Sequence, residues 1–399
     1  MRFINSQKDD IEKVTCASRH LIKQMITAFS PVVHRRTASV IANEFGHKTE
    51  FMIRVPLTDL QLDIYSAFTS YFYKHLERVE GAHGDNFLAD PGSSILWRVL
   101  NYMRALCNHP QAFHGIYYRD TLQHLRPERR KPHLHGRSCG SDASEVPDKP
   151  DLSDDTWLRN IYQKFTSPKS VHHSNKMTLL LAILKECKRI GDKVLLFTHN
   201  ISSLDYLEKL IRSQSFSLCR LDGSIPFTTR AQDITCFNTG SHDVYLISTK
   251  AGGMGLNLQV ANRVIILDTD FSPMWEEQAV GRSYRMKQKK HVYVYHLCTE
   301  GSVETKLVRI KHWKHRLADL VVDQSWERRK VVLGEDDLVS YKEEPRKVER
   351  RKVWKGAEFW REDKEVLDKV MEQAGVHGKL SVKDVQVLSR VKPGEKKDV

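Results

Sequence analysis

The chain has 399 residues, of which 40% are hydrophobic and 28% charged, enough to bury one or two hydrophobic cores. Its net charge of +13 favours a polyanionic partner such as a nucleic acid, with a merely soluble basic protein as the alternative. Seven cysteines without a C-x-x-C pair, no signal peptide and no apolar run of transmembrane length argue against a secreted or membrane-spanning protein and predict a soluble, intracellular one with reduced thiols.

The N-terminal part, residues 1–118, predicts a mostly helical module. Residues 52–56 form a short apolar run typical of a strand. Residues 57–76 and 95–106 carry apolar side chains at helical spacing, and the second run stops near Pro110. We therefore expect this module to pack against the rest of the chain and not to hold an active site.

Residues 119–155 change in composition and predict a disordered insertion. Residues 126–137 are basic, whereas residues 141–155 are polar and acidic with two prolines. The basic part is a candidate for contact with DNA or for nuclear import, and a plain solvated linker is an equal alternative.

Short apolar strands alternate with amphipathic helices between residues 174 and 310. The predicted strands are 194–197, 216–221, 244–248, 264–268 and 292–297, and the predicted helices include 176–190, 202–212 and one from Pro226 to Phe237. Such alternation predicts a parallel, doubly wound α/β sheet, in which ligands bind at the carboxyl ends of the strands.

The C-terminal part of the chain is rich in charge. Residues 303–329 predict one long charged helix. Residues 331–399 predict a polar tail with a basic cluster at 346–352 and a small helical element at 366–371. The composition of this tail indicates no particular function.

A glycine-rich stretch, Ser248 to Leu258, comes directly after the strand at 244–248. Gly252, Gly253 and Gly255 let the backbone adopt positive φ angles and approach a ligand closely. An ordinary tight loop is the alternative interpretation of these glycines.

A second polar motif lies at 278–285, for which we predict a helix. Gln278, Arg282 and Arg285 are spaced i, i+4 and i+7, so they share one helix face. Gly281 lies inside this predicted helix at a cost of about 1 kcal/mol, which a close approach would explain. Guanidinium groups beside a glycine-rich turn suit a phosphate, whereas a solvated helix face is the alternative for the arginines alone.

These segments resemble, in order, motifs of the C-terminal half of the Swi/Snf-type chromatin-remodelling ATPases, within them the ATRX-like branch. The similar segments are Cys107 to Pro110 (C-N-H-P), His173 to Met177, Lys193 to Thr198 (motif IV), Arg220 to Ser224 with Arg230, Ser248 to Leu258 (motif V) and Gln278 to Arg285 (motif VI). Met1 to Asn5 resembles the segment after motif III, and Val321 to Arg328 resembles the brace region.

The resemblance implies a RecA-like second lobe of a helicase-type ATPase, with five segments along the chain. These are a mostly helical module at 1–118, a disordered basic and acidic insertion at 119–155, the helicase C-terminal lobe at 156–310, a brace helix at 311–330 and a charged, partly helical tail at 331–399. It also implies a nuclear protein whose partners are double-stranded DNA and nucleosomes.

The resemblance further implies a role for each motif residue. Arg282 and Arg285 would be arginine fingers on the γ-phosphate of ATP. Gly253, Gly255, Gln278 and Gly281 would line the ATP site, and Thr198, Lys250, Asn257 and Phe271 would lie near the DNA backbone. No residue of this chain is expected to bind a metal ion.

The sequence departs from the family pattern in three respects. Phe271-Ser-Pro273 stands where the family has W-N-P, and Lys287 stands where it has a glycine. The sequence also contains no G-x-x-x-x-G-K-[ST] and no D-E-x-H element, which belong to the first lobe. We therefore expect ATP and Mg²⁺ to be held mostly by a first lobe, encoded in a longer transcript or a separate chain, and little hydrolysis by this chain alone.

Two alternative functions remain open from the sequence. The first is a non-catalytic, DNA- or nucleosome-binding remnant of a remodeller. The second is another superfamily member, such as an RNA helicase.

Overall fold

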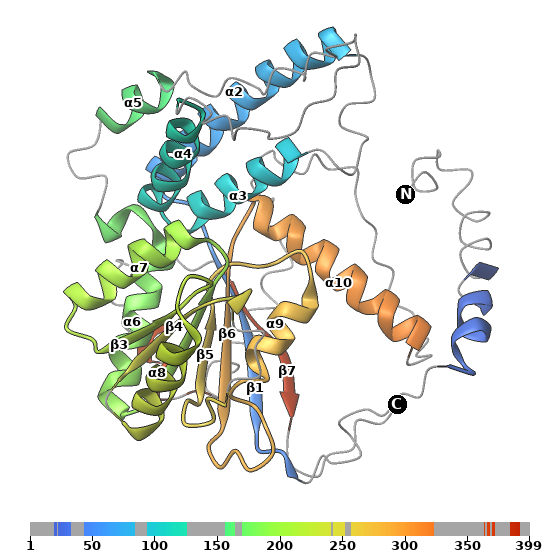
Figure 1. Cartoon of the computed structure of the whole chain (residues 1–399), viewed down its shortest axis with the longest axis vertical. Helices are drawn as coiled ribbons and strands as arrows, with labels where there is room; N and C mark the ends of the chain where they lie inside the picture. The colour runs from blue at the N-terminus through green and yellow to red at the C-terminus, as the bar shows by residue number, and fades with distance from the viewer. Residues whose placement is uncertain are drawn as a thin grey trace, which may run out of the picture.

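The protein is described here from a computed structural model (Figure 1). The structure describes residues 20–21, 23–32, 44–83, 94–125, 156–163, 170–240, 242–251, 257–322, 363, 365–367, 369–371 and 384–391.

A seven-stranded sheet with the order β3-β4-β2-β5-β6-β1-β7 forms the centre of the fold. The strands are β1 (Lys48–Val55), β2 (Val194–Thr198), β3 (Leu218–Leu221), β4 (Val244–Ser248), β5 (Arg263–Ile266), β6 (Val292–Thr299) and β7 (Asp384–Val391). Six of them are parallel, and β7 pairs antiparallel with β1 at one edge. The structure thus confirms the predicted parallel α/β sheet and adds an antiparallel edge strand.

Helices cover both faces of this sheet, because alternate residues of each strand point to opposite sides. Leu196 of β2 packs with α6 (Asn175–Ile190) and α7 (Ile201–Ser213). Its neighbour Phe197 packs with α8 (Phe227–Thr239) and α9 (Pro273–Val280) on the other side. β2 and β4 are buried along their whole length, as their unbroken apolar sequences predict.

Local sequence signals explain where several of these helices begin and end. The hydroxyl of Ser174 accepts a hydrogen bond from the N–H of Met177 and caps α6, which ends at Gly191 with a φ of 76°. Pro273 occupies the first turn of α9, where its missing N–H costs nothing. Pro226 immediately precedes α8, which begins at Phe227 and not at the proline.

A separate helical layer lies beside the sheet (Figure 1) and has its own core. It consists of α2 (Asp59–His83), α3 (Ser94–Asn108), α4 (Pro110–Leu125) and α5 (Thr156–Gln163), and the first turns of α10 (Val303–Val322) complete it; a short 3₁₀ helix, Val171–His173, precedes α6. Phe68 lies at the centre of this core, edge-on to Tyr102 and Phe113 at 5.8 and 5.5 Å.

The boundaries of the predicted N-terminal module and insertion differ from those of the fold. β1 comes from the N-terminal module and pairs with β6, so the sheet includes a strand from each side of the 119–155 segment. α4 extends to Leu125, so the first part of that segment is helical and not disordered, whereas residues 126–155 lie outside the described residues.

Part of the predicted charged tail also belongs to the folded lobe. Val366, Leu367 and Val370 are buried in the same core as α6 and α7. The buried carboxylate of Asp363 lies 2.7 Å from Nη1 of Arg263 in β5. The basic cluster at 346–352 and the brace residues after Val322 lie outside the described residues.

Candidate functional site

Three of the predicted site residues, Thr198, Lys250 and Phe271, lie at the edge of the sheet where β2, β4 and β5 end. The N–H of Thr249 donates to the carbonyl of Thr198, and the N–H of Leu267 donates to that of Phe197, both at 3.0 Å. Lys250 lies two residues after β4, and Phe271 lies in the loop between β5 and α9. In parallel sheets such an edge is where a ligand binds.

Asp268, which follows β5, is a structural centre of this edge. Its buried carboxylate accepts hydrogen bonds from Thr198 Oγ1 at 2.9 Å, from Asn108 Nδ2 at 3.1 Å and from the N–H of His199 at 2.8 Å. Thr198 is fully buried, and its hydroxyl is used for this bond. Thr198 thus supports Asp268 within the protein, and its contact with DNA stays a prediction.

The C-N-H-P element is also structural. The amide of Asn108 donates to Ser203 Oγ at 3.1 Å in addition to Asp268, and its carbonyl accepts a hydrogen bond from Ser174 Oγ at 2.6 Å. Lys176 at the start of α6 forms a buried ion pair of 2.7 Å with Glu304 of α10. These contacts fasten the helical layer and α10 to the sheet.

A charged group that the sequence reading missed lies at the same edge. His199 Nδ1 lies 2.9 Å from the carboxylate of Asp270, and Arg104 of α3 lies 3.6 Å from its other oxygen. Burial alone would raise the pKa of Asp270, but His199 and Arg104 hold it well below its ordinary value. The position of His199 directly after a strand was a signal that could have identified it.

The Gln278–Arg285 motif is not one continuous helix. α9 ends at Val280, Gly281 caps it with a right-handed backbone, and Arg282 and Arg285 lie in the turns that follow. A Cβ on Gly281 would lie 3.3 Å from the carbonyl of Glu277, so the close approach is to the preceding helical turn. The prediction that Gln278, Arg282 and Arg285 share one helix face is wrong, because the helix stops between them.

Arg282 and Arg285 nevertheless lie in one short turn. Arg282 is only 7% exposed, whereas Arg285 is half-buried and its Nε donates to the carbonyl of Gly281 at 2.8 Å. Burial and the neighbouring charge of Arg285 together lower the pKa of Arg282. An anion placed beside this pair would offset both effects.

The arginine-bearing turn is hydrogen-bonded to the segment that follows the glycine-rich stretch. The N–H of Leu258 donates to the carbonyl of Arg282 at 3.3 Å, and the amide of Gln288 donates to the carbonyl of Gln259 at 2.8 Å. Exposed Asn257 is thereby placed beside the arginine turn, and exposed Lys250 lies at the other end of the stretch. Residues 252–256, with the predicted Gly253 and Gly255, lie outside the described residues.

Lys287 adopts a φ of 71°, in the left-handed region that favours glycine. A glycine, which the resemblance leads us to expect at this position, would adopt this φ without a steric cost.

Phe271 is half-buried between two other side chains. Nζ of Lys314 in α10 lies 3.2 Å from the centre of its ring, and the ring of Trp97 in α3 stands edge-on to it at 5.7 Å. The aromatic plane that we expected Phe271 to offer to DNA is therefore largely occupied from within the protein.

A buried network of charged side chains holds the first turn of α9 in place. His296 of β6 lies between Glu276 of α9 and Glu50 of β1, with nitrogen–oxygen distances of 3.1 and 3.2 Å. Glu276 also pairs with Lys311 of α10 at 2.7 Å. The helix that leads into the arginine turn is thus fixed to two strands and to α10.

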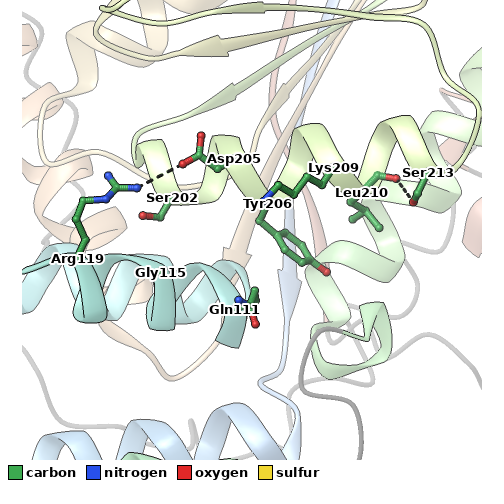
Figure 2. A pocket seen from close by; sticks show the side chains of 9 residues that line it. All are labelled: Gln111, Gly115, Arg119, Ser202, Asp205, Tyr206, Lys209, Leu210 and Ser213. Carbon is green, nitrogen blue, oxygen red and sulfur yellow. Dashed lines mark hydrogen bonds and ion pairs between the residues drawn. The ribbon is translucent and has the colours of Figure 1, made fainter. Parts of the chain in front are cut away.

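A pocket of about 430 Å³ between α4 and α7 is distinct from this edge (Figure 2). Arg119 of α4 and Asp205 of α7 face each other across it at 3.4 Å, and Gly115 and Ser202 line its narrow part. None of the predicted site residues lines this pocket.

Within the described ranges, no group of three histidine, cysteine, aspartate or glutamate side chains could hold a metal ion. Among the helices that the structure describes, none is long and apolar enough to cross a membrane.

Comparison with known proteins places these motifs in a family. Residues 175–287 match the helicase conserved C-terminal domain. The chain is 29% identical to the ISWI chromatin-remodeling complex ATPase ISW2 of Saccharomyces cerevisiae, over 80% of this chain and 24% of that protein. It is 29% identical to the DNA repair and recombination protein RAD54-like of Danio rerio, over 82% of this chain and 40% of that protein.

A shorter stretch is more similar to another relative. The chain is 40% identical to Switch 2 of Arabidopsis thaliana over 42% of this chain and 20% of that protein. The chain thus spans between 20% and 40% of the length of these curated relatives. Among solved structures, the C-terminal part of the Fun30 ATPase domain aligns over 70% of this chain and 98% of that one, with 23% identity and a TM-score of 0.47.

Proposed function

Because this chain carries a RecA-like helicase C-terminal lobe of the Swi/Snf type, we propose that it is the second ATPase lobe of a double-stranded DNA translocase that remodels chromatin in the nucleus. The observation that carries the proposal is the arginine-bearing turn. It follows α9 and is hydrogen-bonded to Leu258 and Gln259, at the side of the sheet where β5 and β1 begin. The ATRX-like branch stays a prediction.

In this proposal Arg282 and Arg285 stabilise the charge on the transferring phosphoryl group of ATP. The two residues are three positions apart beyond α9, and burial together with the neighbouring charge of Arg285 lowers the pKa of Arg282. Gln278 and Gly281 would line the same site, together with Gly253 and Gly255. Mg²⁺ and the phosphate cradle are assigned to a first lobe, on a longer polypeptide or on a separate chain.

Lys250 and Asn257 are the proposed contacts to the phosphodiester backbone of duplex DNA. Both are exposed, and they flank the glycine-rich stretch at its two ends. Lysine and asparagine side chains are typical donors to phosphate oxygens. DNA and nucleosomes are therefore the proposed partners.

The test is ATP hydrolysis by the chain, alone and joined to a first lobe from a Swi/Snf-type relative, each with and without duplex DNA. The chain alone should hydrolyse almost no ATP, whereas the joined protein should show DNA-stimulated turnover. Arg282→Ala or Arg285→Ala should lower that turnover by about 10³-fold and leave DNA affinity nearly unchanged, because the fingers act in the transition state.

Two results would contradict the proposal. DNA-stimulated turnover by the chain alone would reveal a nucleotide cradle within these residues. Full turnover by either arginine variant of the joined protein would show that the arginines are not fingers. Salt-sensitive duplex binding without turnover in the joined protein would favour the non-catalytic, DNA-binding alternative.

A further inference from the structure

The ring of Trp97 is the most exposed part of a small surface formed by three residues, called here the aromatic corner: Trp97, Phe271 and Lys314. Trp97 is 49% exposed, an unusual position for an indole in a folded domain. It stands edge-on to Phe271 at 5.7 Å and 84°, which fixes its orientation. Phe271 is thus a support, and Trp97 is the side chain that faces outward.

Lys314 places a positive charge in this corner. Its Nζ lies over the ring of Phe271 and donates to the backbone carbonyl of the same residue at 3.3 Å. Burial lowers the pKa of Lys314, partly offset by Asp270. An ammonium group carries three N–H donors, so an anion bound here has donors to accept from.

The aromatic corner is connected through the protein to Lys250, one of the two proposed DNA contacts. Lys250 follows Thr249, whose N–H bonds to the end of β2. His199, also at the end of β2, pairs with Asp270 at 2.9 Å, and Asp270 directly precedes Phe271. A series of contacts therefore connects Lys250, which follows β4, with the aromatic corner, which follows β5.

The chemistry of the corner differs from that of the two proposed DNA contacts. Lys250 and Asn257 offer only hydrogen bonds and charge, which suit phosphates. An exposed indole beside an ammonium group also offers a flat face, which suits the face of a nucleobase. In a duplex the base faces are covered by stacking, so such a face is available only on an unpaired nucleotide.

We propose that Trp97 and Lys314 bind a nucleotide whose base is unpaired, with the indole stacked on the base and the ammonium group on its phosphate. The proposal rests on the proposed DNA-binding function and adds a preference for single-stranded or gapped DNA at this corner. The net charge of the chain and the neighbouring lysine favour a nucleic acid over a protein as the occupant.

The experiment measures binding of the full chain to three fluorescent DNAs of equal length: a single-stranded oligothymidine, a complete duplex and a duplex with a short single-stranded gap. Trp97→Ala should weaken binding to the first and third by about 5- to 100-fold, the contribution of one stacked base. Duplex binding should change less than about twofold. Trp97→Phe, which keeps an aromatic plane, should recover most of the loss.

Two further variants test the proposed phosphate contact and provide a control. Lys314→Met should lower the slope of log affinity against log salt by about 0.7 for the single strand, as expected for one phosphate contact. Leu388→Ala is the matched control, because Leu388 is also an exposed apolar residue but lies on β7. It should change none of the affinities, and equal melting temperatures of all variants would show that the fold is intact.

The outcomes separate this inference from the proposed function. If the unaltered chain binds none of the three DNAs in a salt-dependent way, the DNA-binding function itself fails. If it binds them, but Trp97→Ala changes every affinity equally or changes none, DNA binding stands and the unpaired-base site is disproved. In the second case the exposed indole belongs to a surface for a protein partner.

Discussion

Nδ1 of His296 lies 3.1 Å from a carboxylate oxygen of Glu276, the residue of α9 that is six positions before Arg282. Because Nε2 of the same ring faces Glu50, both ring nitrogens meet acceptors, as only the protonated imidazolium can satisfy. Lys48 of β1 and Lys311 of α10 face the two carboxylates from the remaining sides. The helix that precedes the arginine-bearing turn is therefore held in place by His296, a side chain that can gain or lose a proton.

The stability of the lobe should depend on pH through His296 and Glu276. Burial alone would lower the pKa of His296, but Glu276 and Glu50 raise it above its ordinary 6.5. The stabilisation by His296 should thus be complete below pH 6.5 and be lost as the pH rises through the higher folded pKa. The pKa of Glu276 is lowered to about 2, so its contribution is present above pH 4.5 and is lost as the pH falls towards 2.

Urea unfolding between pH 3 and pH 9 measures this dependence. His296→Gln should lower the free energy of unfolding by about 3 kcal/mol near pH 6, because two buried carboxylates lose a shared partner. It should also flatten the alkaline decline that the unaltered protein shows. An identical alkaline decline in both proteins would mean that another group causes it.

Thr198→Val tests the structural role of Thr198. Removal of the hydroxyl leaves Asp268 short of one donor and should lower the free energy of unfolding by about 1–3 kcal/mol. Duplex affinity, measured by fluorescence anisotropy, should not change. Weaker duplex binding at unchanged stability would show that Thr198 contacts DNA.

Lys250→Ala tests the proposed contact of Lys250 with DNA. One lost phosphate contact should lower the slope of log duplex affinity against log salt by about 0.9, with only a small loss of affinity at low salt. Lys185→Ala is a control, since Lys185 is an exposed lysine of α6 away from the predicted motifs. An equal change in slope for both variants would indicate a diffuse charge effect and no specific contact.

Lys287→Gly should stabilise the protein by about 1 kcal/mol, because glycine adopts a φ of 71° without the steric cost of a side chain. Thermal unfolding of the variant gives this value. Lys289→Gly, at a neighbouring residue with no positive φ, should be neutral or destabilising. A lower melting temperature for Lys287→Gly would show that the lysine side chain makes a favourable contact.

The buried ion pair between Arg263 and Asp363 should be essential to the attachment of the C-terminal segment. Asp363→Ala removes a carboxylate partner of the buried guanidinium of Arg263. It should lower the free energy of unfolding, measured with a denaturant, by about 3–5 kcal/mol. It should also expose the segment around Val366 to proteolysis. Resistance to protease equal to that of the unaltered protein would show that the apolar contacts alone hold this segment.

The fold was largely predictable because its signals are local. The strands at 194–198 and 244–248 are continuous apolar runs, and Gly191 marks the end of α6. β7 was not predictable, because it is an edge strand in a highly charged region and is defined by its pairing with β1.

The site was less predictable than the fold, since burial and pairing decide what each side chain does. Spacing placed Arg282 and Arg285 on one helix, but the chain turns at Gly281. A polar residue at a strand end suggested a ligand contact for Thr198, although its partner in the structure, Asp268, is distant in sequence. Trp97 escaped notice because an apolar residue in an amphipathic helix usually points inward.

The position of β1 in the sheet sets the order in which the chain can fold. Its residues are synthesised before both of its neighbours: Thr49 contacts His291, which lies 242 residues later, and β7 follows later still. During translation this apolar strand has neither of its two neighbours, which makes it a target for mispairing with other nascent chains. This eight-residue strand therefore gains its full set of backbone hydrogen bonds only after β6 and β7 have been synthesised.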